Sequence, residues 1–230
     1  MPNWWVADMW STSPILLVSW VFWVICSITL HELSHGWAAI RCGDRTPIET
    51  GHMTWNPIVH MGPTSLIMFA VTGITWGAMP INPARFRGRY DEAKVAFAGP
   101  AMNLLLATLC TLAFGLWIGT AGGRWFSGVS ANQVLYHNVQ IFLRVGVMLN
   151  IMLFLFNLLP VPPLDGSRVL SSIHPGYRRM LEGPNAGQIA LGLFVVLFLF
   201  GGKYIFRAAS EATDVATHAI VSVLAPGPRP

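Results

Sequence analysis

The chain has 230 residues, of which 53% are hydrophobic and only 10% are charged. Soluble domains carry charge on about a quarter of their residues, so this composition excludes a soluble globular protein and indicates an integral membrane protein. The net charge of +4 comes from basic residues dispersed among loops beside apolar segments, which argues against binding to nucleic acid. Three cysteines without zinc-finger spacing are too few for a disulfide framework.

Apolar segments follow one another along the chain, and three of them are long enough to cross a bilayer. They cover residues 15–40, 93–118 and 139–159. The segment at 64–78 is apolar but falls below the roughly 17 residues that a crossing helix needs, so we expect it to be re-entrant or to lie against the bundle. The last apolar run, 189–206, is the fourth predicted span, although the sequence leaves open whether it crosses completely.

The downstream end of the first span carries His31-Glu32-Leu-Ser-His35. In a helix, His31 and His35 lie at i and i+4 on one face, where both imidazoles can reach a single ion. This H-E-x-x-H arrangement is typical of zinc hydrolases, in which the glutamate acts on a water molecule beside the ion and is not a ligand. The alternative is a pair of histidines held by structural hydrogen bonds. Three ionisable groups so close together in an apolar segment are rarely tolerated without a function, which favours the metal site.

A catalytic zinc site with two histidines needs at least one more protein ligand. Asp165 is the best candidate, because it follows a span directly within Pro160-Val-Pro-Pro-Leu-Asp-Gly166, whereas most other acids lie in loops among basic residues. Irregular backbone at membrane depth is tolerated only where it is buried in protein or lines a cavity. Asp165 could also cap a short helix that starts near Ser167, and the two roles can coexist.

This ligand set makes a demand on the topology. His35 and Asp165 lie near the C-terminal ends of the first and third predicted spans, so these spans must run parallel, with an odd number of crossings between them. The short apolar segment therefore does not cross. Residues 39–94 and 161–185 together hold nine Lys or Arg, against one in 119–138. By the positive-inside rule, the active site is expected near the cytoplasmic side of a prokaryotic plasma membrane.

The predicted fold is an all-α polytopic membrane protein, a helical bundle of about four spans plus a re-entrant segment and short β-strands near the active site. The strands are expected within residues 48–55, which follow the first span and have a strand-like composition, and residues 119–138 are expected to form a loop. We expect one domain over 1–210, with a core at about 20–175, followed by a C-terminal tail over 211–230.

The motifs resemble those of the site-2 protease family of intramembrane zinc metalloproteases, in its compact prokaryotic form without a PDZ or CBS domain. Three elements carry the resemblance in the family's order: His31-Glu-Leu-Ser-His35, Gly99-Pro-Ala-Met-Asn103 and Asn157-Leu-Leu-Pro-Val-Pro-Pro-Leu-Asp-Gly166. The resemblance implies that His31, His35 and Asp165 bind one zinc ion per chain. It also implies that Glu32 is the general base and that Asn157 helps to hold the substrate or the developing oxyanion.

The sequence thus predicts an enzyme that hydrolyses peptide bonds in or near transmembrane segments, in regulated intramembrane proteolysis or in the clearance of signal-peptide remnants. Its expected partners are a transmembrane protein or peptide substrate and the lipid bilayer, with a regulatory membrane partner left open and no other cofactor. Two alternatives are a divalent-metal transporter and a catalytically inactive binder of membrane proteins. A transit site has no need of Glu32 beside a ligand, and the complete set of ligands and base argues against inactivity.

The sequence leaves two polar side chains without an assigned role. His60 lies in a loop bounded by prolines, where a contact with substrate and a structural hydrogen bond are about equally plausible. Asn103 is expected to form hydrogen bonds across helices rather than to act in catalysis.

Overall fold

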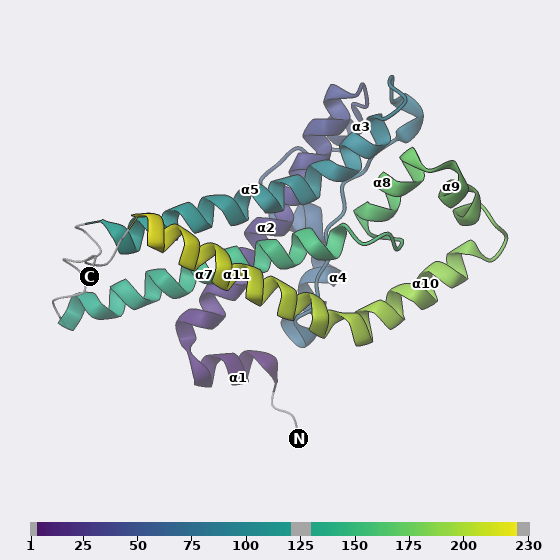
Figure 1. The fold of residues 1–230 in the computed structure, drawn as a ribbon. Helices are drawn as coiled ribbons and strands as arrows, with labels where there is room; N and C mark the ends of the chain where they lie inside the picture. Colours follow the sequence, from purple (N-terminus) through teal and green to yellow (C-terminus); the bar gives the residue numbers. More distant parts are fainter. Residues whose placement is uncertain (1–3, 121–129, 225–230) are drawn as a thin grey trace.

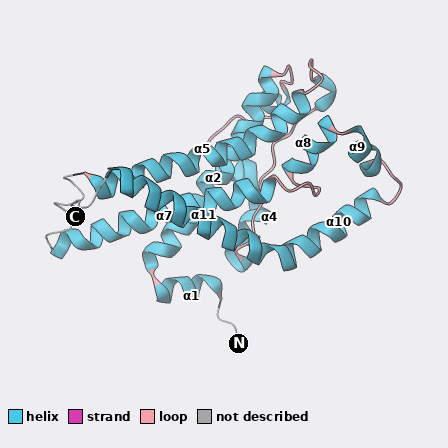
Figure 2. Ribbon diagram, in the orientation of Figure 1, coloured by secondary structure: helices cyan, strands magenta, loops and turns pink. Residues whose placement is uncertain are grey.

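The computed structural model describes residues 4–120 and 130–224, and all regular secondary structure in these residues is helical (Figure 2). Four helices are long and apolar enough to cross a membrane (Figure 1). They are α2 (Pro14–Arg41), α5 (Asp91–Gly119), α7 (Ser130–Asn157) and a continuous 39-residue helix over Ala186–Leu224. The last is built from α10 (Ala186–Val196), the π-helical turn η2 (Leu197–Gly201) and α11 (Gly202–Leu224). The prediction of about four long apolar helices is confirmed, and the last run belongs to a helix long enough to cross.

Shorter helices connect the long ones or pack beside them. They are α1 (Trp5–Thr12), α3 (Thr46–Glu49), α4 (Pro57–Thr72), the 3-10 helix η1 (Pro83–Arg85), α8 (Asp165–Ile173) and α9 (Pro175–Leu181). Of the apolar segment expected at 64–78, residues 64–72 form the second half of α4, which begins at Pro57 behind its cap Asn56 and ends before Gly73, and residues 74–78 follow the helix. Gly73 adopts a φ of +78°, a conformation that favours glycine and stops the helix. With 16 residues, α4 is shorter than a full crossing.

The β-strands expected within residues 48–55 are a wrong prediction for the described part of the chain. This segment forms α3 and the turns that follow it, because its backbone donors bond to carbonyls close by in sequence. The N–H of Gly51 donates to the carbonyl of Ile48, and that of His52 to the carbonyl of Pro47. With its donors used locally, the segment offers no ladder for a neighbouring strand.

The loop expected over 119–138 is also partly wrong, since residues 130–138 are the first turns of α7. Residues 121–129 of that loop lie outside the described residues. Residues 211–224, which the sequence assigns to a tail, continue α11.

The buried core lies where α2, α5 and α7 meet. Trp23 and Ile28 of α2, Cys110 of α5, and Val147 and Leu149 of α7 belong to one buried hydrophobic cluster. The indole N–H of Trp23 also donates to the carbonyl of Phe142 on α7, at 2.8 Å. Since lipid tails are as apolar as these side chains, the close packing and the interhelical hydrogen bond hold the helices together. The core thus fixes α2, which carries the histidine pair, against α5 and α7.

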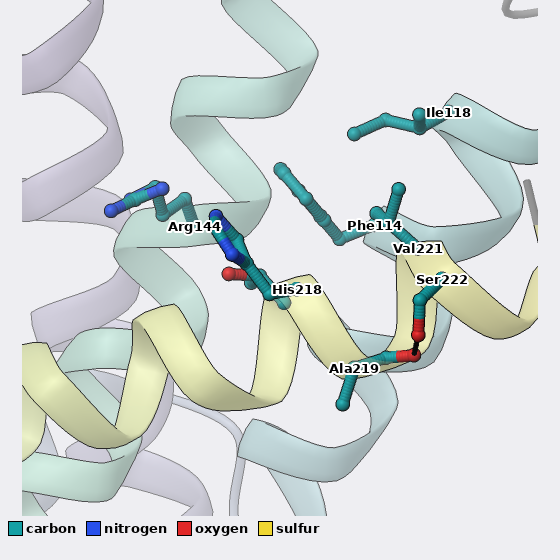
Figure 3. A pocket seen from close by; sticks show the side chains of 8 residues that line it. Phe114, Ile118, Arg144, His218, Ala219, Val221 and Ser222 are labelled. Carbon is teal, nitrogen blue, oxygen red and sulfur yellow. Dashed lines mark hydrogen bonds between the residues drawn. The ribbon is translucent and has the colours of Figure 1, made fainter. Parts of the chain in front are cut away.

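Helix α11 packs against α5 and α7. Arg144 of α7 forms an ion pair with Asp214 of α11. A cavity of about 650 Å³ lies beside Arg144, and Figure 3 shows Arg144 and His218 among the side chains that line it. The cavity is lined by Phe114, Ile118, Arg144, Thr217, His218, Ala219, Val221 and Ser222. None of the predicted site residues lines it.

Candidate metal centre

The structure brings the three predicted metal ligands together. His31 and His35 lie one turn apart on α2, and Asp165 is the first residue of α8. The two Nε2 atoms are 3.0 Å apart, and Oδ2 of Asp165 lies 3.1 Å from Nε2 of His31 and 3.3 Å from Nε2 of His35. Both histidines are buried and Asp165 is nearly so. The histidine pair of α2 and the first residue of α8, which follows α7, therefore meet at one place in the fold.

These distances and donor types fit a zinc ion. A tetrahedral zinc ion with bonds of about 2.0–2.1 Å places its ligand atoms about 3.3 Å apart. Two imidazole nitrogens and one carboxylate oxygen are ordinary zinc ligands, and three protein ligands leave a fourth position for water or substrate. The cluster is thus a candidate catalytic zinc site.

Helix α5 holds both histidine rings from the side. Nδ1 of His35 lies 2.7 Å from the carbonyl oxygen of Val95, and Nδ1 of His31 lies 2.6 Å from Oδ1 of Asn103. Each ring therefore has a hydrogen-bond partner at Nδ1 and turns Nε2 toward the cluster, as is usual for metal-binding histidines. Between the two contacts lies Gly99, where a Cβ atom would come within 2.4 Å of His35 Nε2 and 2.5 Å of His31 Nε2. Only a residue without a side chain leaves the cluster open on this side.

A sharp turn after α7 carries Asp165 to the histidines. The backbone folds back so closely that a Cβ atom at Gly166 would lie 2.2 Å from the carbonyl oxygen of Leu158. The hydroxyl of Tyr177 on α9 donates to the carbonyl of Pro160 at 2.9 Å and fixes the other side of the turn. The N-cap residue of α8 is Leu164, and among the described residues no backbone N–H of this helix donates to the side chain of Asp165. The geometry therefore favours the ligand role of Asp165 over the cap.

Glu32 lies next to the first histidine on α2 and is buried. Its carboxylate packs against the segment that follows α4, where a Cβ atom at Gly77 would lie 2.6 Å from Oε1. Within the two described ranges, no residue forms a hydrogen bond or an ion pair with Glu32. Its carboxylate is therefore not committed to a structural partner among the described residues.

Two other candidates lie outside this cluster. Asn157 is the last residue of α7, and its amide donates to the Leu153 carbonyl in its own helix at 3.0 Å. In the part of the chain that the structure describes, no hydrogen bond joins it to the three cluster residues or to Glu32. His60 is buried, with Nε2 2.7 Å from the carbonyl oxygen of Thr54, and its own carbonyl accepts from the N–H of Ala78. His60 thus connects two loops beside the site.

Sequence reasoning missed one polar residue near the histidines. Asn150 of α7 is fully buried, and its Oδ1 accepts a hydrogen bond from Nδ2 of Asn103 at 3.0 Å. The available signal was a lone amide side chain within an apolar span, which in a membrane favours a partner on a neighbouring helix.

A polytopic helical protein with a buried His-His-Asp cluster and a neighbouring glutamate has the features of a membrane metalloprotease, and comparisons with known proteins agree. The family model for peptidase family M50 matches residues 125–201. Over 193 residues the chain is 35% identical to YwhC of Bacillus subtilis (strain 168), provisionally named a zinc metalloprotease, with 82% of each chain covered. The chain belongs to peptidase family M50, the site-2 protease family of zinc metalloproteases.

Two mycobacterial relatives carry the same provisional name and are longer. The chain is 28% identical over 188 residues to Rip2 of Mycobacterium tuberculosis, covering 77% of this chain and 64% of Rip2. It is 30% identical over 216 residues to Rip3 of the same organism, covering 84% of this chain and 46% of Rip3. No solved structure matches the chain.

Proposed function

We propose that this protein is an intramembrane zinc metalloprotease that hydrolyses peptide bonds in or near transmembrane segments of membrane proteins. The observation that carries the proposal is the convergence of His31, His35 and Asp165 within 3.3 Å of one another beside Glu32, among helices long enough to span a membrane. The positive charge of the loops at this end of the bundle supports a site nearer the cytoplasmic side.

The chemistry divides between the ion and the residues around it. A zinc ion held by His31, His35 and Asp165 would polarise the scissile carbonyl and lower the pKa of a water molecule. Glu32 takes the proton of the attacking water and passes it to the leaving amine, a role for which its uncommitted carboxylate is suited. Asn157 keeps one amide hydrogen beyond its bond to Leu153 and would donate it to the substrate or to the developing oxyanion.

The segment after α4 supports a way of holding the substrate. Residues 74–79 alternate between exposed and half-buried, a period of two that indicates an extended backbone. Both backbone groups of Trp76 bond to the Ser65 hydroxyl, and the N–H of Ala78 donates to the His60 carbonyl. In the described structure, the backbone groups of Gly77 and Met79 have no such partner, and they lie on the other edge. An unwound substrate can pair with this edge as a strand, next to Glu32.

The test compares the wild type with Glu32→Gln in detergent, using a panel of single-span substrates and a measurement of bound zinc. Glu49→Gln is the control, because Glu49 is an exposed glutamate paired with Arg85 outside the cluster. We expect Glu32→Gln to lose cleavage while retaining zinc, and Glu49→Gln to keep both. If wild type and variant both bind zinc but cleave nothing, zinc flux in liposomes would instead support the transporter. Absence of zinc binding by the wild type would refute the proposal.

A further inference from the structure

The asparagines behind His31 form a chain of hydrogen bonds that reaches from α7 through α5 to α2. We propose that Asn103 and Asn150 are positioning residues, which fix the proton of His31 on Nδ1 and leave Nε2 free to bind the ion. This inference rests on the proposed function, since it takes the His-His-Asp cluster as the zinc site. It adds two residues, on two further helices, that would control how one ligand is presented.

The donor-to-acceptor direction of this hydrogen-bond chain is set at Asn150, the end farthest from His31, by a backbone carbonyl. Nδ2 of Asn150 lies 2.9 Å from the carbonyl oxygen of Gly146. A carbonyl oxygen can only accept, so the NH2 group of Asn150 must face Gly146 and its Oδ1 must face the other way. That Oδ1 then accepts from Nδ2 of Asn103, at 3.0 Å.

The same reasoning continues to the histidine. Because the NH2 group of Asn103 faces Asn150, its Oδ1 faces His31 and lies 2.6 Å from Nδ1. An amide oxygen cannot donate, so Nδ1 of His31 must carry the hydrogen. Nε2 is then unprotonated in the neutral ring, and it points to Oδ2 of Asp165 at 3.1 Å. The carbonyl of Gly146 thus determines the tautomer of a ligand two helices away.

Burial makes this arrangement hard to reverse. Asn103 and Asn150 are both fully buried, so water cannot replace a lost partner. Turning either amide over would set two oxygens or two NH2 groups against each other along the chain. We call Asn150 and Asn103, which link the Gly146 carbonyl to His31, the relay. His35 needs no such intermediate residues, since the Val95 carbonyl accepts from its Nδ1 directly. Each of the two histidines is therefore linked to a backbone carbonyl, His35 directly and His31 through two asparagine side chains.

The experiment measures zinc affinity of purified full-length protein by competition with a chelator. Asn103→Leu removes the acceptor at similar volume and is expected to weaken zinc binding about 10- to 100-fold. Asn150→Leu is expected to weaken it less, since Asn103 can still offer its oxygen. Asn103→Asp keeps an acceptor for His31 although its second oxygen faces Oδ1 of Asn150, so it should bind zinc more tightly than Asn103→Leu. Thr111→Val is the matched control, because the Thr111 hydroxyl bonds only within α5, to the carbonyl of Ala107.

A second measurement separates positioning from general packing. Nitrogen-15 NMR of the zinc-free protein, with His31→Gln identifying the resonances, should show His31 protonated at Nδ1 in the wild type and a tautomer mixture in Asn103→Leu. The relay is overturned if His31 of the wild type is protonated at Nε2, or if Asn103→Leu binds zinc as tightly as Thr111→Val. Neither measurement requires cleavage. If the asparagine variants change zinc affinity and tautomer as expected but the wild type cleaves no substrate, only the proposed function is contradicted. If the wild type binds no zinc, the proposed function is again contradicted, and the NMR measurement still tests the role of the asparagines.

Discussion

Gly99 offers a direct test of where the ion sits. A methyl group at position 99 would lie 2.4 Å from Nε2 of His35 and 2.5 Å from Nε2 of His31, whereas ordinary contacts of a Cβ atom begin near 3.4 Å. Gly99→Ala therefore overlaps both ligand atoms by about 1 Å and pushes the rings off the cluster. A displacement of that size in a catalytic site can cost ~10²-fold in rate, and we expect a loss of at least this order in both zinc affinity and cleavage.

Thermal unfolding with added zinc makes the expectation quantitative. At a free zinc concentration of about 100 times its dissociation constant, binding stabilises the wild type by about 2.7 kcal/mol. A variant that binds ~100-fold more weakly would gain only about 0.4 kcal/mol under the same conditions. The zinc-free variant should remain folded, because alanine is favoured over glycine in a helix by about 1 kcal/mol and the overlap falls on side chains that can rotate.

The matched control is Gly192→Ala in α10, where the added methyl group would meet no atom within 4 Å. This variant should keep the full stabilisation by zinc. If Gly99→Ala also keeps it, the ion does not lie between the histidine rings and α5, and the site as described is refuted. Equal loss in both variants would show that the assay reports on helix packing rather than on the metal site.

Two further predictions concern the loops beside the site. Met79→Pro removes one N–H from the free edge after α4 and should slow cleavage without changing zinc content, whereas Met79→Leu should leave both cleavage and zinc content unchanged. Unchanged cleavage by Met79→Pro would exclude strand pairing there. Asp44, fully buried just after α2, accepts from Thr46 through Oδ1 and from the Asn82 N–H through Oδ2. Burial raises the pKa of this carboxyl, but these hydrogen bonds and Arg85 outweigh it and hold the pKa below its ordinary value. Ionised Asp44 thus stabilises the folded protein at any pH above about 3.9, its pKa in the unfolded chain. This stabilisation is lost as the pH falls through the lower pKa that Asp44 has in the folded protein. Asp44→Asn turns an NH2 group toward one set of donors and should lower the free energy of unfolding by about 1–3 kcal/mol at pH 7. In thermal melts over a range of pH, the difference in stability between wild type and variant should shrink below about pH 4. A difference that stays constant with pH would contradict this reasoning.

The long helices and the histidine pair were predictable because each depends on a local pattern. The length of an apolar run identifies a span, and four-residue spacing places His31 and His35 on one face. The start of α7 was missed, since polar residues such as Asn132 and Gln133 suggest a loop. A helix that continues beyond the bilayer needs no apolar residues there, so composition marks the span and not the helix.

The short elements and the surroundings of the ligands depend on contacts that composition does not encode. Residues 48–55 have a strand-like composition, but their backbone N–H groups form hydrogen bonds within local turns and are not available for pairing with a strand. Asn103 meets Asn150 across 47 residues of sequence, and no local pattern pairs them. Gly99 suggests close packing of helices, but only the structure shows that the neighbours are the two ligand rings.

The match between α2 and α5 explains why these residue types occur together. His31 and His35 are four residues apart on α2, and on α5 the residues that meet them, Val95, Gly99 and Asn103, repeat at the same interval. His35 faces Val95 and His31 faces Asn103, so the order of contacts along the two helices is reversed, and Gly99 falls midway. Rows with four-residue spacing pack against each other in this way when two helices lie close. The Gly-Pro-x-x-Asn element therefore fits against H-E-x-x-H: its glycine leaves space beside both Nε2 atoms, its asparagine contacts Nδ1 of one ring, and the carbonyl one turn before the glycine contacts Nδ1 of the other.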